Sequence, residues 1–142
     1  MKRLITTILV LFAATIVMAQ ENDIFKGRIV NDEYDIYIEF DLYNPQILVP
    51  GQEVFGEVAG YIGSKHCGQV WPVVSGEILD GNTAVLTVIN NYGSEDFTCR
   101  LTLNSDSTYS YKKIEGSTLK FPVNQKWQKI PSSVKFKRPE KK

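Results

Sequence analysis

Apolar and polar residues alternate with a period of two through most of the chain beyond its first twenty residues. The clearest stretch runs from Tyr34 to Leu42, where even positions are apolar or aromatic and three of the four odd positions are carboxylates. Successive side chains of a β-strand point to opposite faces, so this period predicts a strand with one buried face. Residues 97–103 repeat the pattern, and residues 83–89 are rich in β-branched side chains, which favour strands.

Turn-forming residues separate the predicted strands at fairly regular intervals. Pro50-Gly51 suits a type II turn, because proline fixes φ and glycine accepts a positive φ. Asp80-Gly81, between two apolar runs, is a strong hairpin signal. Further strands are expected at 24–30, 53–62, 70–79, 108–114 and 134–137, with a short one at 119–121 or around Trp127.

Eight or nine short strands joined by hairpins predict an all-β fold, an antiparallel up-and-down meander. Such a sheet has two exposed edges, and closing it into a small barrel removes them by pairing the first strand with the last. A two-sheet β-sandwich is the alternative. A membrane-spanning barrel is disfavoured, because most of these strands are shorter than the ~9–11 residues that a tilted spanning strand needs.

The first nineteen residues have the three parts of a cleavable signal peptide. These are the basic start Met1-Lys2-Arg3, an apolar run that ends at Val17, and small residues before the cleavage point Ala19-Gln20. The run is shorter than the ~20 residues that span a bilayer, although an uncleaved anchor is the alternative. We expect a β-barrel domain at 20–137, a basic tail at 138–142, and a periplasmic or secreted protein. A lipoprotein is not expected, because no cysteine adjoins the cleavage point.

Charge is divided unevenly along the chain. From Glu21 to Asp96 there are 13 acidic residues against three basic ones, whereas from Phe97 onward 11 basic residues face three acidic ones. A closed barrel would place acidic N-terminal strands beside basic C-terminal ones, and a partner-binding face is the alternative explanation. Loss of Lys2 and Arg3 with the signal peptide leaves 14 basic against 16 acidic residues, which gives no reason to expect a nucleic-acid partner.

Cys67 and Cys99 are the two cysteines of the chain, and in an oxidising compartment they are expected to form a disulfide. Two free thiols are the alternative, because Cys99 falls on the inward face of its strand and Cys67 lies in a glycine-flanked loop. His66 adjoins Cys67, but neighbours in an extended chain point to opposite faces, which disfavours a catalytic pair. A zinc site would need another ligand from elsewhere, so no metal is predicted.

Motifs for catalysis or cofactor binding are lacking. The sequence contains no Gly-x-Ser-x-Gly, no phosphate-binding glycine loop and no dinucleotide fingerprint. We therefore expect a binding protein without a cofactor rather than an enzyme.

Exposed aromatic residues are the main candidates for binding. Tyr61, Trp71 and Tyr92 are expected at the mouth of the barrel, where aromatic rings stack against a sugar or another small molecule; packing within the fold is their alternative role. The bulky inward positions 36, 38, 40 and 42 predict a filled interior. The loop at 63–68, which carries Lys65 and His66, is the candidate contact for an envelope protein partner.

Four short motifs follow one another along the chain: Phe25-x-Gly27-x-Ile29, Ile36-x-Ile38-x-Phe40, Gly56 followed by Gly60-Tyr61, and Trp127-x-x-Ile130-Pro131-x-x-Val134-x-Phe136. In this rhythm the chain resembles small exported bacterial β-barrels of the calycin-like (lipocalin-like) type, many without an assigned activity. A second resemblance is to inhibitors of C-type lysozyme, whose Ser-Gly-x-x-Tyr motif is approached by Ser105-Asp106-Ser107-Thr108-Tyr109, with aspartate in place of glycine. The second resemblance implies an inhibitor of an envelope-targeting enzyme.

Overall fold

The computed structural model describes residues 23–140, and the predicted signal peptide lies outside this range. The strands are β1 (Lys26–Asn31), β2 (Ile36–Asp41), β3 (Ile47–Leu48), β4 (Glu57–Val58), β5 (Gly60–Ser64), β6 (Val70–Ile78), β7 (Thr83–Ile89), β8 (Asp96–Leu103), β9 (Tyr109–Gly116), β10 (Lys120–Val123), β11 (Lys126–Lys129) and β12 (Ser133–Phe136), with a short 3-10 helix, η1 (Glu53–Phe55). Within this range no helix is long and apolar enough to cross a membrane.

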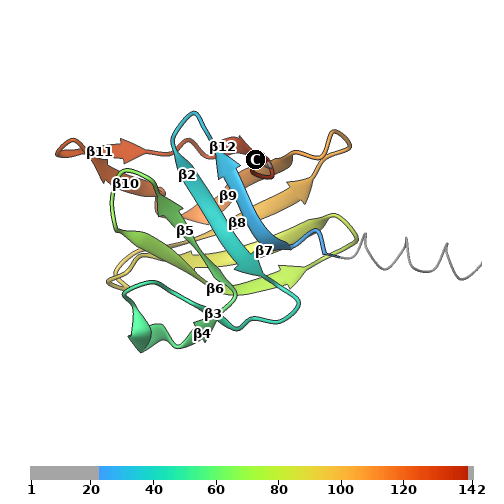
Figure 1. Cartoon of the computed structure of the whole chain (residues 1–142), viewed down its shortest axis with the longest axis horizontal. Helices are drawn as coiled ribbons and strands as arrows, with labels where there is room; N and C mark the ends of the chain where they lie inside the picture. The colour runs from blue at the N-terminus through green and yellow to red at the C-terminus, as the bar shows by residue number, and fades with distance from the viewer. Residues whose placement is uncertain (1–22, 141–142) are drawn as a thin grey trace, which may run out of the picture.

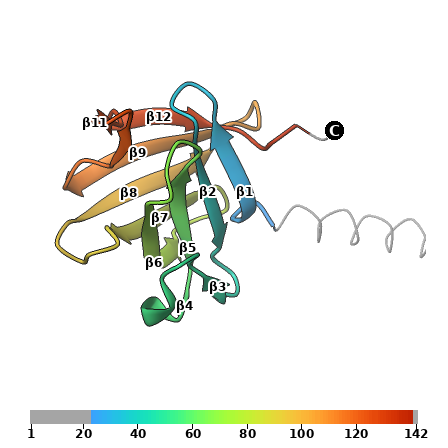
Figure 2. The same cartoon turned by 60° about the vertical axis from the view of Figure 1, so that its left-hand side comes forward.

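Eight strands form one antiparallel sheet in the order β1-β2-β5-β6-β7-β8-β9-β12. The sheet curls until its two edges lie side by side, so the first and last strands become neighbours (Figures 1 and 2). Two hairpin-like additions, β3–β4 and β10–β11, pair only within themselves. The predicted all-β meander and its near closure into a barrel are therefore confirmed.

A seam between β1 and β12 remains largely open. One backbone bridge crosses it in the described part of the chain, where Val30 and Lys137 exchange hydrogen bonds of 2.8 and 2.9 Å. Continuing this register places Arg28 opposite Pro139, which has no N–H to donate. The side chain of Arg138 donates instead, through Nη1 to the carbonyl oxygen of Arg28 at 3.4 Å. The Arg138 side chain therefore supplies the hydrogen bond that the backbone of Pro139 cannot donate.

Further side-chain hydrogen bonds support this closure on either side of the bridge. Arg138 also donates from Nη2 to the Ile24 carbonyl oxygen at 3.1 Å and to the Tyr109 hydroxyl at 3.1 Å. Beyond the bridge, the buried Asn31 donates from its side-chain amide to the carbonyl oxygen of Lys135 at 2.8 Å. Arg138, which the sequence assigns to the tail, thus packs against the barrel.

Bulky side chains fill the barrel interior, as the inward positions of the sequence predict. The inward residues of β2, Ile36, Ile38 and Phe40, are at most 1% exposed. Aromatic rings form a continuous line of contacts through the core, with centroid separations of 5.6 to 6.3 Å: Trp71, Phe97, Tyr111 and Phe136. The barrel lumen is therefore occupied by side chains.

The predicted strand at 53–62 is divided into η1, β4 and β5. Gly56 takes a positive φ of 63°, which turns the chain between η1 and β4. Gly60 opens β5 where a Cβ atom would lie 2.2 Å from the carbonyl oxygen of Glu39 on β2. The segment from β3 to β4 packs on the outer face of the sheet, where it forms a second apolar cluster.

Acidic and basic halves of the chain meet where the barrel closes. Lys137, beside the seam, forms an ion pair with Asp32 at 3.1 Å, and this carboxylate raises the pKa of Lys137. At one end of the barrel, Lys120 lies 3.6 Å from Glu95. The uneven charge of the sequence is thus partly accounted for by packing.

Replacing Arg138 with alanine is expected to lower the free energy of unfolding by about 1–2 kcal/mol, because several carbonyl and hydroxyl groups at the seam lose a donor. Urea denaturation of the Arg138→Ala variant measures this. Arg100→Ala is the matched control, since Arg100 is exposed on β8. Equal stability of the two variants would contradict a sealing role for Arg138.

Candidate functional site

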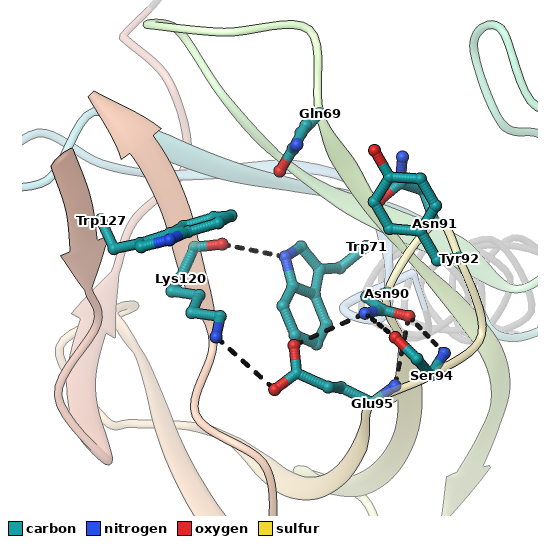
Figure 3. A pocket seen from close by; sticks show the side chains of 9 residues that line it. All are labelled: Gln69, Trp71, Asn90, Asn91, Tyr92, Ser94, Glu95, Lys120 and Trp127. Carbon is teal, nitrogen blue, oxygen red and sulfur yellow. Dashed lines mark hydrogen bonds and ion pairs between the residues drawn. The ribbon is translucent and has the colours of Figure 1, made fainter. Parts of the chain in front are cut away.

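A small pocket lies at one end of the barrel, where three connections meet. These are the β5–β6 loop, the β7–β8 turn and the β10–β11 hairpin, which come together at the left of Figure 1. The pocket has a volume of about 170 Å³, smaller than the ~300–1,000 Å³ typical of sites for drug-sized ligands. Its lining is mostly aromatic and polar (Figure 3): Gln69, Trp71, Asn90, Asn91, Tyr92, Ser94, Glu95, Lys120 and Trp127.

Trp71 forms the floor of the pocket. It belongs to β6, is only 3% exposed, and packs against Phe97 of the core. Its Nε1 donates a hydrogen bond of 3.0 Å to the carbonyl oxygen of Lys120, the first residue of β10. The same ring therefore anchors the hairpin to the barrel and presents a fixed apolar surface.

Two exposed aromatic side chains flank this floor. Figure 3 shows Trp127, from β11, and Tyr92, from the β7–β8 turn, on opposite sides of Trp71. Trp127 is 55% exposed and Tyr92 is 77% exposed. The ammonium group of Lys120 lies 5.0 Å from the centroid of the Trp127 ring, a cation–π contact that helps to orient the indole.

The polar wall is built by the β7–β8 turn. The side-chain oxygen of Asn90 accepts hydrogen bonds from the backbone N–H groups of Ser94 at 2.9 Å and Glu95 at 3.3 Å. The Asn90 amide donates to the Ser94 hydroxyl at 3.0 Å and to Oε2 of Glu95 at 3.5 Å. These contacts hold the Glu95 carboxylate beside Lys120.

This arrangement is suited to stacking and hydrogen bonding. Aromatic surfaces lie next to amides, a carboxylate and an ammonium group, all within one small hollow. In the described residues, no group of three or more His, Cys, Asp or Glu side chains could hold a metal ion. The chemistry that these residues offer is recognition of a small ligand with both an apolar face and polar substituents.

The structure brings two of the three predicted aromatic residues together. Trp71 and Tyr92 line the pocket, whereas Tyr61 does not. Tyr61 is only 8% exposed and lies in the second apolar cluster, with its ring 6.0 Å from that of Tyr37. Successive side chains of a strand alternate between its two faces. Because Ile62 faces the core, Tyr61 faces the other side of the sheet. Burial raises the pKa of its hydroxyl.

Sequence reasoning missed Trp127, Lys120 and Glu95 as parts of this pocket. A signal for the hairpin is present at Asn124-Gln125, where both residues take positive φ values of 52° and 66°, as a tight hairpin turn requires. The position of the hairpin against β6 depends on tertiary packing, which the sequence of the hairpin alone does not predict.

Lys65 and His66 lie exposed in the β5–β6 loop but do not line the pocket. The His66 ring nitrogen Nε2 is 2.9 Å from Oδ2 of Asp35, in the turn after β1. The backbone N–H of Lys65 donates to the carbonyl oxygen of Asp35 at 2.9 Å. The loop is therefore tied to its neighbouring turn, while Gln69 at its other end reaches the pocket.

The predicted disulfide is not formed. Cys67 and Cys99, both in the described part of the chain, are free thiols. The Cys99 side chain is fully buried in the core, whereas Cys67 lies in the β5–β6 loop and is only partly buried. A disulfide needs Cβ atoms about 3.5–4.5 Å apart, and β8 is paired on both sides at Cys99, opposite Leu86 and Lys113, which keeps it from shifting toward the loop.

Comparisons with models of known protein families, with curated proteins and with solved structures find no match to this chain.

A thiol-reactive maleimide is expected to modify Cys67 in the folded protein and to leave Cys99 unmodified. Burial keeps reagents away from Cys99 and raises the pKa of its thiol to about 12, so little reactive thiolate forms. Mass spectrometry after labelling counts the modified residues, and labelling in denaturant should modify both. A denatured protein that takes up label only after reduction would contradict the free thiols.

Proposed function

We propose that this protein is a non-enzymatic binding protein that holds one sugar ring of a glycan in the pocket at the end of the barrel. The observation that carries this proposal is the pair of exposed rings, Trp127 and Tyr92, on either side of the buried Trp71. An aromatic side chain left in solvent next to a polar wall provides a stacking surface with hydrogen-bonding groups at its edge.

A sugar ring has the two kinds of surface that this pocket offers. Its C–H faces are apolar and stack on aromatic rings, while its hydroxyl groups lie around the ring edge. Gln69, Asn91 and Glu95 provide amide and carboxylate groups that donate to or accept from hydroxyls. The volume of about 170 Å³ favours a single ring over a longer buried segment.

The filled core supports a site at the barrel end rather than in the lumen. A lipocalin-style cavity needs space between the inward side chains, and here the inward faces of β2, β8 and β9 carry fully buried residues. The predicted signal peptide would deliver the protein to the periplasm or the exterior, where glycans are abundant.

A protein-interaction module is the second candidate function. Lys65 and His66 stand exposed in a loop that Asp35 holds at two points. A loop ordered before binding loses little conformational entropy on entering the cleft of a partner enzyme. Alanine substitution at both residues would abolish partner binding without altering the pocket.

Trp127→Ala and Tyr92→Ala are each expected to weaken glycan binding about three- to tenfold, because an aromatic stacking contact contributes roughly 0.5–1.5 kcal/mol. Isothermal titration calorimetry of the mature protein with a panel of soluble oligosaccharides measures this. Tyr43→Ala is the matched control, since Tyr43 is also an exposed tyrosine and lines a different hollow, next to Asp80.

Two results would contradict this proposal. One is the absence of binding to every oligosaccharide in the panel. The other is equal loss of affinity in the pocket variants and in Tyr43→Ala, which would place the contact elsewhere.

A further inference from the structure

Resting on the proposed function, we infer that the bound sugar is neutral and that the pocket reads two hydroxyl groups on adjacent ring carbons. One hydroxyl donates to the carboxylate of Glu95, and its neighbour accepts from the ammonium group of Lys120. These two side chains form an ion pair inside the pocket, next to Trp127 (Figure 3).

The geometry of the ion pair leaves hydrogen-bonding capacity unused. Lys120 Nζ lies 3.6 Å from Glu95 Oε1, longer than the ~2.7–2.9 Å of a strong ammonium–carboxylate hydrogen bond. A carboxylate accepts at about four lone-pair positions, and an ammonium group donates three hydrogens. Both groups can therefore bind a ligand while they remain beside each other.

Both charged groups are held in place before a ligand arrives. Glu95 is fixed through the Asn90 contacts of the β7–β8 turn. Lys120 is fixed at its backbone by the hydrogen bond from Trp71 and near its ammonium by the ring of Trp127. About one third or less of each side chain is exposed. Little entropy is then lost when hydroxyl groups bind to them.

Charge balance selects the class of sugar. Lys120 and Glu95 lie only 3.6 Å apart. A sugar carboxylate that approached Lys120 would therefore also lie next to Glu95, and a sugar ammonium that approached Glu95 would also lie next to Lys120. A hydroxyl group both donates and accepts. Two neighbouring hydroxyls therefore satisfy the carboxylate and the ammonium together without adding charge.

The ion pair adjoins the Trp127 ring, with the ammonium group of Lys120 over one face of the indole. The ammonium group of Lys120 is 5.0 Å from the Trp127 centroid. A sugar in the pocket beside Trp127 would thus turn an edge that carries hydroxyls toward Glu95 and Lys120.

The test measures binding of three kinds of oligosaccharide to the mature protein by calorimetry: oligomers of neutral hexoses, of galacturonic acid and of glucosamine. We expect the neutral oligomers to bind best, with little dependence on salt. Lys120→Met keeps the aliphatic stem, and Glu95→Gln keeps the shape of the side chain. Each is expected to weaken neutral-sugar binding at least tenfold, whereas the exposed-surface controls Lys126→Met and Glu115→Gln leave it unchanged.

Binding that is strengthened by Glu95→Gln and abolished by Lys120→Met would identify an acidic ligand and overturn the inference. The opposite pattern would identify an amino sugar and also overturn it. Neutral-sugar binding that depends on Trp127 but not on Glu95 or Lys120 would overturn the hydroxyl contacts and leave the proposed function standing. A failure of every oligosaccharide to bind would instead remove the proposed function itself.

A second measurement avoids substitutions in the protein altogether. Monodeoxy derivatives of the best neutral sugar are titrated into the unaltered protein. We expect two adjacent positions at which loss of the hydroxyl lowers affinity at least tenfold. A uniform response around the ring would contradict the inference.

Discussion

A single eight-stranded sheet closes into a barrel when its last strand returns to its first, and here that return depends on a few polar contacts. The ladder between β1 and β12 stops at Val30 and Lys137, because Pro139 offers no N–H at the next hydrogen-bonding position. The guanidinium group of Arg138 supplies the missing donors from the side. Gly27 leaves the space for it, since a Cβ atom there would lie 2.8 Å from Nη1 of Arg138.

A filled barrel and an accessible pocket are two results of the same packing. The line of aromatic rings from Trp71 to Phe136 leaves the lumen to side chains. The β10–β11 hairpin then covers one end, with Phe121 buried and Trp127 on the outside. The accessible hollow therefore lies at the rim, where Trp71, packed against Phe97, lines the pocket.

Most strands of the main sheet and their meander order were predictable from the sequence, because alternation and turn residues act over a few positions. The alternation from Tyr34 to Leu42 and the Asp80-Gly81 turn correspond to β2 and to the β6–β7 hairpin. Two of the three aromatic residues of the pocket, Trp71 and Tyr92, were predictable as well. Tyr61, Trp127 and the two cysteines were not, because their surroundings are made by segments far away in the chain. Only the assembled barrel brings Lys120 to Trp71, and only there is Cys99 buried within paired β8 while Cys67 stays in a loop.

The β10–β11 hairpin stands apart from the barrel in one respect, since its ladder involves no strand of the main sheet. The hairpin is attached to the barrel through buried side chains and through the hydrogen bond from Trp71 to the carbonyl oxygen of Lys120. Because this bond is made to the backbone, it does not depend on which side chain residue 120 carries. The outward residues of the hairpin can therefore change while the closure of the barrel and its attachment stay the same. In evolutionary terms, this hairpin is an exchangeable insert whose outward surface can vary on a constant scaffold.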